Sequence, residues 1–436
     1  MLSACHPLRL SLSSETAQKS RRAVLLLAVA AQLLLSSCST ALGPHSLEQS
    51  RLDYNVAVKT TSEEQLLLNI VRLRYMDTPS SLAVSAIAAQ YEWAHTVGLM
   101  PFFTAAGGDI NRSFASLLPQ VQALRADRPT FSLTPLDDQE FTRKLFTPLP
   151  LDAVIYLAKT TWPISTVFRL YLENLNWVSN AQTASGPTPA VAPDFNDFRR
   201  GIEALQQLQN HGQIVFGLEE RTEIAGGALP AGSIKASDIV EAAKNGYEYR
   251  PDDDGKTWSL MKKTQQPVMR VGPSAIGSLE LLTLTQVFKL KPGLDKYDIT
   301  QEALSPFPAT YPADGVSSLD LETRSMLQSL YFVSHGVDVP AEHLANGSAR
   351  QTLDESGNVF DWSRITTGLF SVHHWPSGER PPAARVAVPY RGYWFYIDEA
   401  DHDTKSTFSL LVELSRLELG GKTGSAPVLT LPVGSH

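Results

Sequence analysis

PISTVFRLYLENLNWV, residues 163–178, is the stretch whose pattern most clearly indicates the class of fold. Apolar residues recur in it at the 3.6-residue spacing of a helix that buries one face: Ile164, Val167, Phe168, Tyr171, Leu175 and Val178. Pro163 suits the first position of such a helix, because its missing N–H would have no partner there. The stretch therefore predicts an amphipathic helix packed on a core.

The sequence on either side of this stretch also reads as mainly helical. Thr61 with Glu64, and Ser62 with Gln65, each fit a capping box that opens a helix ending near Met76. Residues 81–99 alternate loosely in polarity and could form a strand pair, and the remaining patterns before the stretch predict helices at 113–126, 137–147 and 151–160. The segment 183–193, rich in Gly, Pro, Ser and Thr, predicts a linker or exposed loop before a helix at 194–210.

The second half of the chain mixes strand and helix patterns. Two β-hairpins are predicted, one with strands at 247–250 and 257–260 and one with strands at 386–388 and 393–397 around Arg391-Gly392. Helices are predicted at 277–289, 320–334 and 406–418, and a short strand at 428–431. We therefore expect an α+β protein with a mainly helical N-terminal half, 54–182, and a mixed helix and antiparallel-sheet C-terminal half, 194–436.

The composition excludes some classes of function. Hydrophobic residues make up 43% and charged residues 19% of the 436-residue chain, which is typical of an ordered globular protein. The formal net charge is −8 and no run of basic residues occurs, so we expect no nucleic-acid partner. No cofactor motif is recognised in the sequence.

The N-terminal residues have the features of a secretory signal peptide. Arg21-Arg22 precedes the apolar run 23–35, which is too short to span a bilayer comfortably. Leu35-Ser36-Ser37-Cys38 then resembles the lipobox of bacterial lipoproteins, an aliphatic residue and two small residues before a cysteine. The resemblance implies cleavage after residue 37 and acylation of Cys38, so that 1–37 is a signal peptide and 38–53 a lipid tether.

This reading also predicts where the protein acts. Ser39 follows the cysteine where lipoproteins retained at the inner membrane usually carry Asp, which implies the outer membrane, with the protein facing the periplasm. The inner membrane and the cell surface are the alternatives. The chain has two cysteines, Cys5 and Cys38, so the mature body would have no free thiol for a disulfide, a metal site or nucleophilic catalysis.

Four segments of the mature chain together resemble an uncharacterised family of bacterial lipoproteins. They are 64–75, 323–325, 390–397 and 429–434, and the resemblance covers most of the mature chain. It implies a location at the membrane and no particular chemistry.

Two polar clusters are candidate metal or catalytic sites. Asp398, Asp401 and Asp403 fall within six residues that also hold Glu399 and His402, and clustered oxygen ligands suit calcium. Their spacing does not fit an EF-hand, and a polar turn before a helix explains them more simply. The adjacent pair His373-His374 could hold a metal or act as a base, but neighbouring residues of a strand point to opposite faces.

Two further groups of residues are candidate binding sites. Tyr393, Trp394 and Tyr396, with Phe395 between them, could form an aromatic platform for a sugar or a partner strand. In a strand, two of these four would face the core and two the opposite side. Arg72, with Arg74 nearby, could bind an anion, although a salt bridge or a solvated position explains it as well.

The sequence favours a binding protein over an enzyme. The Gly-x-Ser-x-Gly elbow, the phosphate-binding loop and the zinc-protease histidine pattern do not occur in it. We expect a lipid-anchored protein of binding or scaffolding type, whose partner is a protein or polysaccharide of the cell envelope. The alternatives are an envelope glycan or lipid hydrolase that uses acids such as Asp398, Asp401 or Asp403, and a lipoprotein that captures substrate for a transporter.

Overall fold

The computed structural model describes residues 44–80, 82–104, 114–135, 139–253, 255–301, 312, 314–376 and 378–419. It confirms an α+β protein, with helices and largely antiparallel sheets along the chain. The chain divides into two units between Ser62 and Glu63. Cys38, the predicted signal peptide and the predicted strand at 428–431 lie outside the described residues.

Helix α2 (Pro44–Arg74) runs through the division between the two units. The sequence predicts a helix that begins at Thr61 or Ser62, and this start is wrong. The hydroxyls of Thr61 and Ser62 instead donate to the carbonyl oxygen of Val58, at 3.1 and 2.7 Å, as they do in a helix interior. In the second unit, Leu67, Ile70 and Val71 of this helix are fully buried.

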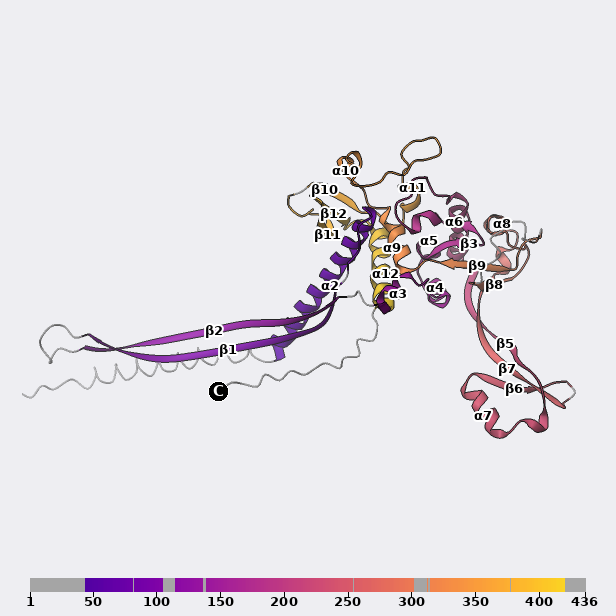
Figure 1. Ribbon diagram of the computed structural model, residues 1–436, viewed down its shortest axis with the longest axis horizontal. Helices are drawn as coiled ribbons and strands as arrows, with labels where there is room; N and C mark the ends of the chain where they lie inside the picture. The colour runs from indigo at the N-terminus through magenta and orange to yellow at the C-terminus, as the bar shows by residue number, and fades with distance from the viewer. Residues whose placement is uncertain are drawn as a thin grey trace, which may run out of the picture. The chain divides into compact units, whose positions relative to one another are not determined.

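A two-stranded antiparallel ribbon follows α2. It consists of β1 (Leu82–Thr104) and β2 (Phe114–Pro135), paired along their length (Figure 1). The helix predicted at 113–126 is therefore wrong, and the strand pair suggested at 81–99 is one strand. Pairing with β1 outweighs the local pattern of β2, and Pro119 would break a hydrogen bond of a helix there.

The main sheet has the strand order β4-β3-β9-β8-β7-β5, and β6 pairs with β7 beside this path. Its strands are β3 (Leu172–Leu175), β4 (Val178–Ser179), β5 (Ile214–Pro230), β6 (Tyr247–Pro251), β7 (Thr257–Val271), β8 (Lys296–Thr300) and β9 (Ser318–Thr323). Neighbours are antiparallel except β8 and β9, which are parallel. The hairpin predicted at 247–260 is confirmed as β6 and part of β7.

The amphipathic stretch 163–178, predicted as one helix, changes structure half-way. Its first part is helix α5 (Ile164–Tyr171), and its second part forms β3 and the start of β4. Asn176 and Trp177 lie in the tight turn between these strands, with φ of 47° and 64°. All four residues of β3 are buried, and pairing with β9 on its other edge outweighs the helical spacing.

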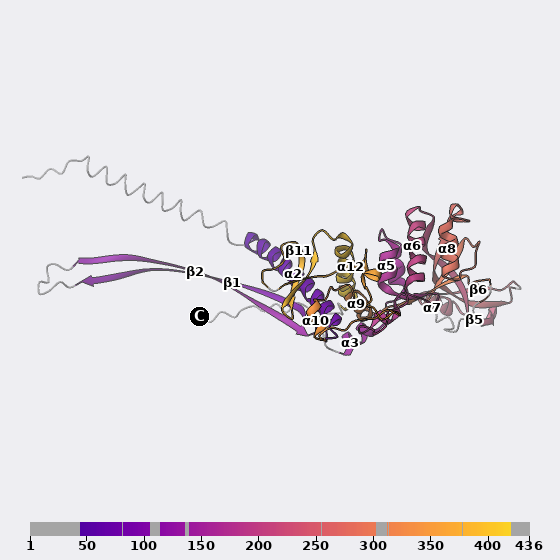
Figure 2. The same ribbon diagram turned by 90° about the horizontal axis from the view of Figure 1, so that it is seen from above.

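Most other predicted helices are confirmed with small shifts at their ends. They are α3 (Gln139–Phe146), α4 (Leu151–Ala158), α6 (Asn196–Asn210), α8 (Leu279–Val287) and α12 (His402–Leu419). The segment predicted as a helix at 320–334 begins as β9 and continues as α9 (Met326–Ser334), where Ser325 and Gln328 form a capping box. Helices α5, α6 and α8 pack side by side (Figure 2). No described helix has both the length and the apolar character to cross a membrane.

A second sheet has the order β10-β12-β11. Its strands are β10 (His373–Pro376), β11 (Ala384–Tyr390) and β12 (Tyr393–Asp398), so the second predicted hairpin is confirmed. Its turn residues Arg391 and Gly392 have φ of 47° and 84°. Positive φ at both central positions is the geometry of a two-residue hairpin turn, and it explains the glycine.

The segment 183–193, expected as a linker or exposed loop, has both buried and exposed residues. Ala184, Ser185 and Thr188 are buried, whereas Val191 is 62% exposed. The carbonyl oxygen of Pro189 accepts a hydrogen bond from Thr352 Oγ1 at 2.7 Å, so this segment is tied to a part of the chain that is distant in sequence. A domain boundary at 183–193 stays a prediction.

Candidate functional site

The sheet β10-β12-β11 presents two different faces. Phe395 and Ile397 of β12 are buried in the core, at 0% and 1% exposure. Trp394 and Tyr396 alternate with them and therefore lie on the opposite face. This confirms the prediction that two of the four consecutive aromatic residues face the core side and two the other side.

The outer face of this sheet carries an aromatic group that spans two strands. Trp375 of β10 is paired with Trp394 and is 45% exposed. His373 is paired with Tyr396, and their ring centroids are 5.6 Å apart. The Trp394 indole N–H donates to the carbonyl oxygen of Gly378 at 3.2 Å, which fixes the ring. We call His373, Trp375, Trp394 and Tyr396 the aromatic face, and its chemistry suits stacking on an apolar or sugar surface.

Tyr393, the third aromatic binding candidate, lies on the other side of the sheet. It packs against the core, and its ring centroid is 5.3 Å from His343 and 5.7 Å from His374. His343 Nδ1 lies in turn 2.7 Å from the hydroxyl of Tyr75, at the end of α2. Burial raises the pKa of the Tyr75 phenol, so Tyr75 stays protonated.

The histidine pair separates as the sequence predicts. His373 lies on the aromatic face, whereas His374 lies beside Tyr393, with its Nδ1 2.9 Å from a carboxylate oxygen of Asp338. The two imidazoles thus have different neighbours and lie on opposite sides of β10. The two imidazoles are therefore not placed to bind the same metal ion.

The end of α2 is held to the β11–β12 turn by polar contacts. Asp77 accepts a short hydrogen bond from the Tyr390 hydroxyl and pairs with Arg391 Nη2 at 3.3 Å. The hydrogen bond from Tyr390 lowers the pKa of the Asp77 carboxyl. Further along the same sheet, Arg385 pairs with Glu63 at 3.2 Å. These contacts hold the helix and the sheet together. The carboxylates of Asp77 and Glu63 therefore have a structural role.

The acidic residues 398–403 form a polar turn that begins a helix. Asp401 accepts hydrogen bonds from the backbone N–H of Thr404, at 2.9 Å, and from its hydroxyl, at 2.6 Å. Asp398 accepts from the N–H of Ala400 at 2.7 Å. Asp403 lies in the first turn of α12, where a carboxylate is favoured by the helix dipole. In the described part of the chain, no group of three or more His, Cys, Asp or Glu is arranged to hold a metal ion.

Arg72 and Arg74 do not converge on one anion site. Arg72 donates to the hydroxyl of Ser80 at 2.8 Å and lies 3.4 Å from the side-chain oxygen of Asn69. Arg74 is buried, and its Nη1 donates to Thr188 Oγ1 and to the carbonyl oxygen of Arg350, both at 3.2 Å. Both side chains connect segments of this chain.

A further surface, which the sequence did not indicate as a site, is the outer part of the β5–β7 ribbon. We call residues 218–267 the arm; it includes most of β5 and β7, β6 and helix α7 (Ala236–Lys244). Figure 1 shows α7 and β6 at the end of the ribbon that is distant from β8. Several large apolar side chains of the arm are exposed: Leu218, 46%; Ile224, 72%; Leu229, 43%; Ile239, 43%; Val240, 54%.

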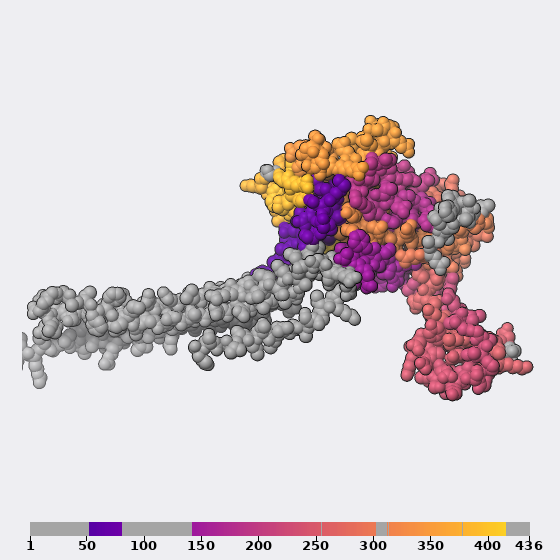
Figure 3. All heavy atoms as spheres, viewed as in Figure 1, coloured from indigo at the N-terminus to yellow at the C-terminus, as the bar shows by residue number. Residues whose placement is uncertain are grey.

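The arm also has a free strand edge. β5 ends the strand order of the main sheet and pairs with β7 on one side, with no second partner among the described residues. Helix α7 has no buried residue. In the space-filling view, no other described segment covers the face of the arm that is turned to the viewer (Figure 3). The arm is therefore an exposed ribbon with apolar side chains in water.

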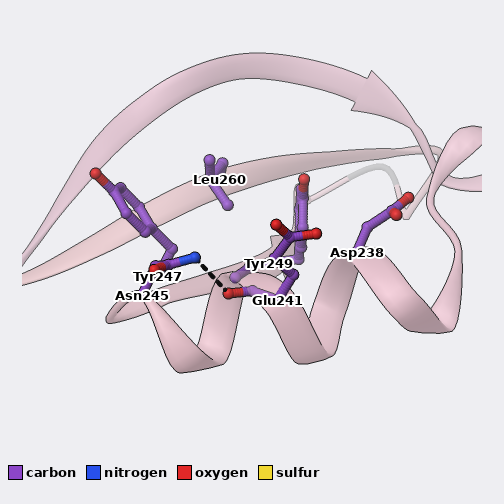
Figure 4. Close-up of a pocket in the computed structure, with 7 residues that line it drawn as sticks. Asp238, Glu241, Asn245, Tyr247, Tyr249 and Leu260 are labelled. Carbon is purple, nitrogen blue, oxygen red and sulfur yellow. Dashed lines mark hydrogen bonds between the residues drawn. The ribbon is translucent and has the colours of Figure 1, made fainter.

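A shallow hollow of about 620 Å³ lies between α7 and strands β6 and β7. Tyr247, Tyr249 and Leu260 line it from the strands, and Glu241 and Asn245 line it from the helix (Figure 4). Asp238, also in the lining, accepts hydrogen bonds from the N–H of Lys235 and from Ser237 Oγ, both at 3.0 Å, and these lower its pKa. Its carboxylate thus caps the helix.

Comparison with known proteins found no matching family model, no similar curated protein and no similar solved structure.

Proposed function

We propose that this chain is a lipid-anchored protein of the bacterial outer membrane that faces the periplasm and works by binding or scaffolding. The proposal for the anchor rests on the basic flank, the apolar run and the lipobox-like residues that end at Cys38. Several acyl chains on one cysteine bind a membrane far more firmly than a single chain. Confinement to a surface would raise the effective concentration of the protein for other envelope components.

The observation that carries the binding proposal is the exposed arm. Soluble proteins rarely leave several large apolar side chains uncovered on one element, and such surfaces mark interaction sites. A free strand edge offers unpaired backbone N–H and C=O groups, to which an extended segment of another protein can add as a new strand. The arm offers both features within 218–230. We therefore infer an envelope protein as the partner, bound along β5.

Site-specific photo-crosslinking in intact cells tests this proposal. A photoreactive amino acid at Ile224 should give one discrete cross-linked product, because this side chain is 72% exposed on the arm. Leu279 on α8 is the matched control, since it is 75% exposed and lies outside the arm. A product from 224 but not from 279 supports the proposal. Equal yields at both positions, or none at 224, would contradict it.

A polysaccharide partner is the second candidate, and the aromatic face favours it. The exposed Trp375 beside Trp394 offers ring surface of the kind that stacks on sugars. Titration with soluble fragments of envelope glycan, followed by tryptophan fluorescence, should saturate for the natural protein and not for Trp375→Ala. A Trp258→Ala variant, changed in the arm, should bind as the natural protein does.

The structure gives less support to three other predictions, namely the hydrolase alternative, the mainly helical first half and the membership in a lipoprotein family. Asp401 accepts two hydrogen bonds at a helix start, which does not favour the hydrolase alternative. The finer division of the chain, with a mainly helical first half, is supported by α2, α4 and α5 and weakened by β1 and β2. The membership in a lipoprotein family stays a proposal, supported by the segments named above.

A further inference from the structure

The β1–β2 ribbon is long for a sheet of two strands. Its strands have 23 and 22 residues, which corresponds to about 70 Å at about 3.3 Å per residue. It forms a sheet of its own, and among the described residues neither strand has a second partner. An isolated two-stranded hairpin is marginally stable at best in water. A further strand at one edge or both would therefore stabilise the ribbon.

The positions of the prolines in β1 and β2 limit where another strand can pair with the outer edges of the ribbon. Proline has no N–H to donate, so it is tolerated in a strand only where that N–H would point away from the existing partner. β2 contains Pro119 and Pro129 and β1 contains Pro101. Between these positions, 120–128 of β2 and 82–100 of β1 have an N–H at every residue. These two windows are the stretches whose outer edges can form a ladder.

The charges of the two strands are complementary. By sequence, β1 carries one acidic residue, Glu92, and no Lys or Arg. β2 carries Arg125 and Arg128 with Asp127, a net positive charge. All four lie in the proline-free windows. Pairing of β2 with β1 of another copy thus brings opposite net charges together, whereas β1 with β1 or β2 with β2 brings like charges together.

We infer that the ribbon is a self-assembly element, in which the outer edge of β2 pairs with the outer edge of β1 of a second copy of this chain. Each copy then uses two different edges, and the contact is head-to-tail. After each copy is added, one β1 edge and one β2 edge stay free at the two ends of the assembly. We therefore expect assemblies larger than dimers. This inference does not depend on the proposed partner of the arm.

Engineered cysteines in the full chain test this inference, because the natural sequence has only Cys5 and Cys38. Two single variants, Ala94→Cys in β1 and Ala126→Cys in β2, keep the charges of both strands. They are expressed together with different tags and treated with a short thiol crosslinker, and we expect a linked species that carries both tags, well above the yield of either variant alone. An Ile224→Cys variant in the arm, expressed with Ala94→Cys, is the matched control and should give none.

A second experiment distinguishes a failure of the copies to assemble from a failure of the ribbon to fold. Thr96 and Gln122 are direct cross-strand partners, so Thr96→Cys with Gln122→Cys in one chain should form an intramolecular disulfide. Adding Glu92→Lys to both cysteine variants should reduce the intermolecular product, and adding Arg125→Glu as well should restore it. If the intramolecular bond forms while the mixed-tag product stays at control level, the inference is wrong. If the intramolecular bond fails to form, the ribbon itself is absent and the inference fails with it.

Discussion

The packed part of the chain around Arg324, which we call the body, differs from the exposed arm in the burial of its charged groups. Arg324 is fully buried and donates to three backbone carbonyl oxygens, those of Arg169, Leu170 and Asn180, at 2.5–3.3 Å. In the arm, Lys263 is half exposed and pairs with Glu220 at 3.1 Å. A buried guanidinium without its acceptors would cost several kcal/mol, whereas a surface pair contributes little. The body therefore depends on its polar contacts for folding, and the arm does not.

The largest effect is expected for Arg324→Ala. The change removes the donor of the Leu170 and Asn180 carbonyl oxygens and one of the two donors of the Arg169 carbonyl oxygen, which also accepts from Asn180 Nδ2. It also removes the guanidinium that lies 3.9 Å above the Phe332 ring. We expect the free energy of unfolding to fall by about 3–5 kcal/mol, measured by urea denaturation. Arg250→Ala in the arm, whose partner is Glu248 at 3.4 Å, is the control and should change it by less than about 1 kcal/mol. A similar decrease in the free energy of unfolding for both variants would contradict this difference between the body and the arm.

Stability of the body should also depend on His335. Burial, with the nearby charges of Arg74 and Arg324, lowers the pKa of His335 to about 3, against 6.5 for an ordinary histidine. The unfolded chain therefore binds a proton below pH 6.5 that the folded chain does not. Stability should be lost as the pH falls from 6.5 toward 3, by a few kcal/mol at about 1.4 kcal/mol per pH unit.

The variant His335→Gln sharpens this prediction. Its free energy of unfolding, measured between pH 7 and pH 4, should vary less with pH than that of the natural protein, even if it is lower at pH 7. His402→Gln, changed at an exposed helix start, should keep the natural slope. An unchanged slope in His335→Gln would show that other groups cause the acid sensitivity.

An intermediate effect is expected for a glycine in the packed part of the chain, with a glycine of the arm as its control. A Cβ on Gly201 of α6 would lie 2.5 Å from Cε2 of the buried Phe288, so Gly201→Ala should cost about 1–3 kcal/mol despite the better helix propensity of alanine. A Cβ on Gly227 of the arm would meet no atom within 4 Å. Gly227→Ala should be neutral. Thermal unfolding of both variants measures the difference, and equal melting temperatures would contradict tight packing at α6.

The smallest effect is expected for the surface ion pair of the arm. Lys263→Ala removes the pair with Glu220 and should change the free energy of unfolding by less than about 0.5 kcal/mol, because both side chains are solvated. The same denaturation experiment in 1 M salt should show no further difference between variant and natural protein. A loss above about 2 kcal/mol would mean that the arm contributes to the cooperative core.

Local signals in the sequence predicted much of the fold. The Arg391-Gly392 turn and the alternation on either side of it were sufficient to place β11 and β12. Helix α6, which buries one apolar face, was also predicted. The failures at 113–126 and 163–178 share a cause, since in each case a strand partner far along the chain overrides a helical spacing.

The candidate sites were predictable only in part. Alternation correctly separated Trp394 from Phe395 and His373 from His374. The sequence did not indicate that Trp375 would lie opposite Trp394, because that pairing joins two strands across a long connection. The arm was missed as a surface, because the apolar run 214–216 and the polar run 219–223 do not show the alternation of a strand. Exposure of its apolar residues is set by what the rest of the chain leaves uncovered, which a local pattern does not report.

Amide hydrogen exchange across 218–230 measures whether the arm is a binding surface that is not needed for folding of the body. The exchange is compared between the protein in native membranes and the same protein purified in detergent. We expect slower exchange along β5 in membranes, where the partner adds to its edge, and equal exchange in α6 and α8 in both states. Equal exchange of β5 in both states would contradict it.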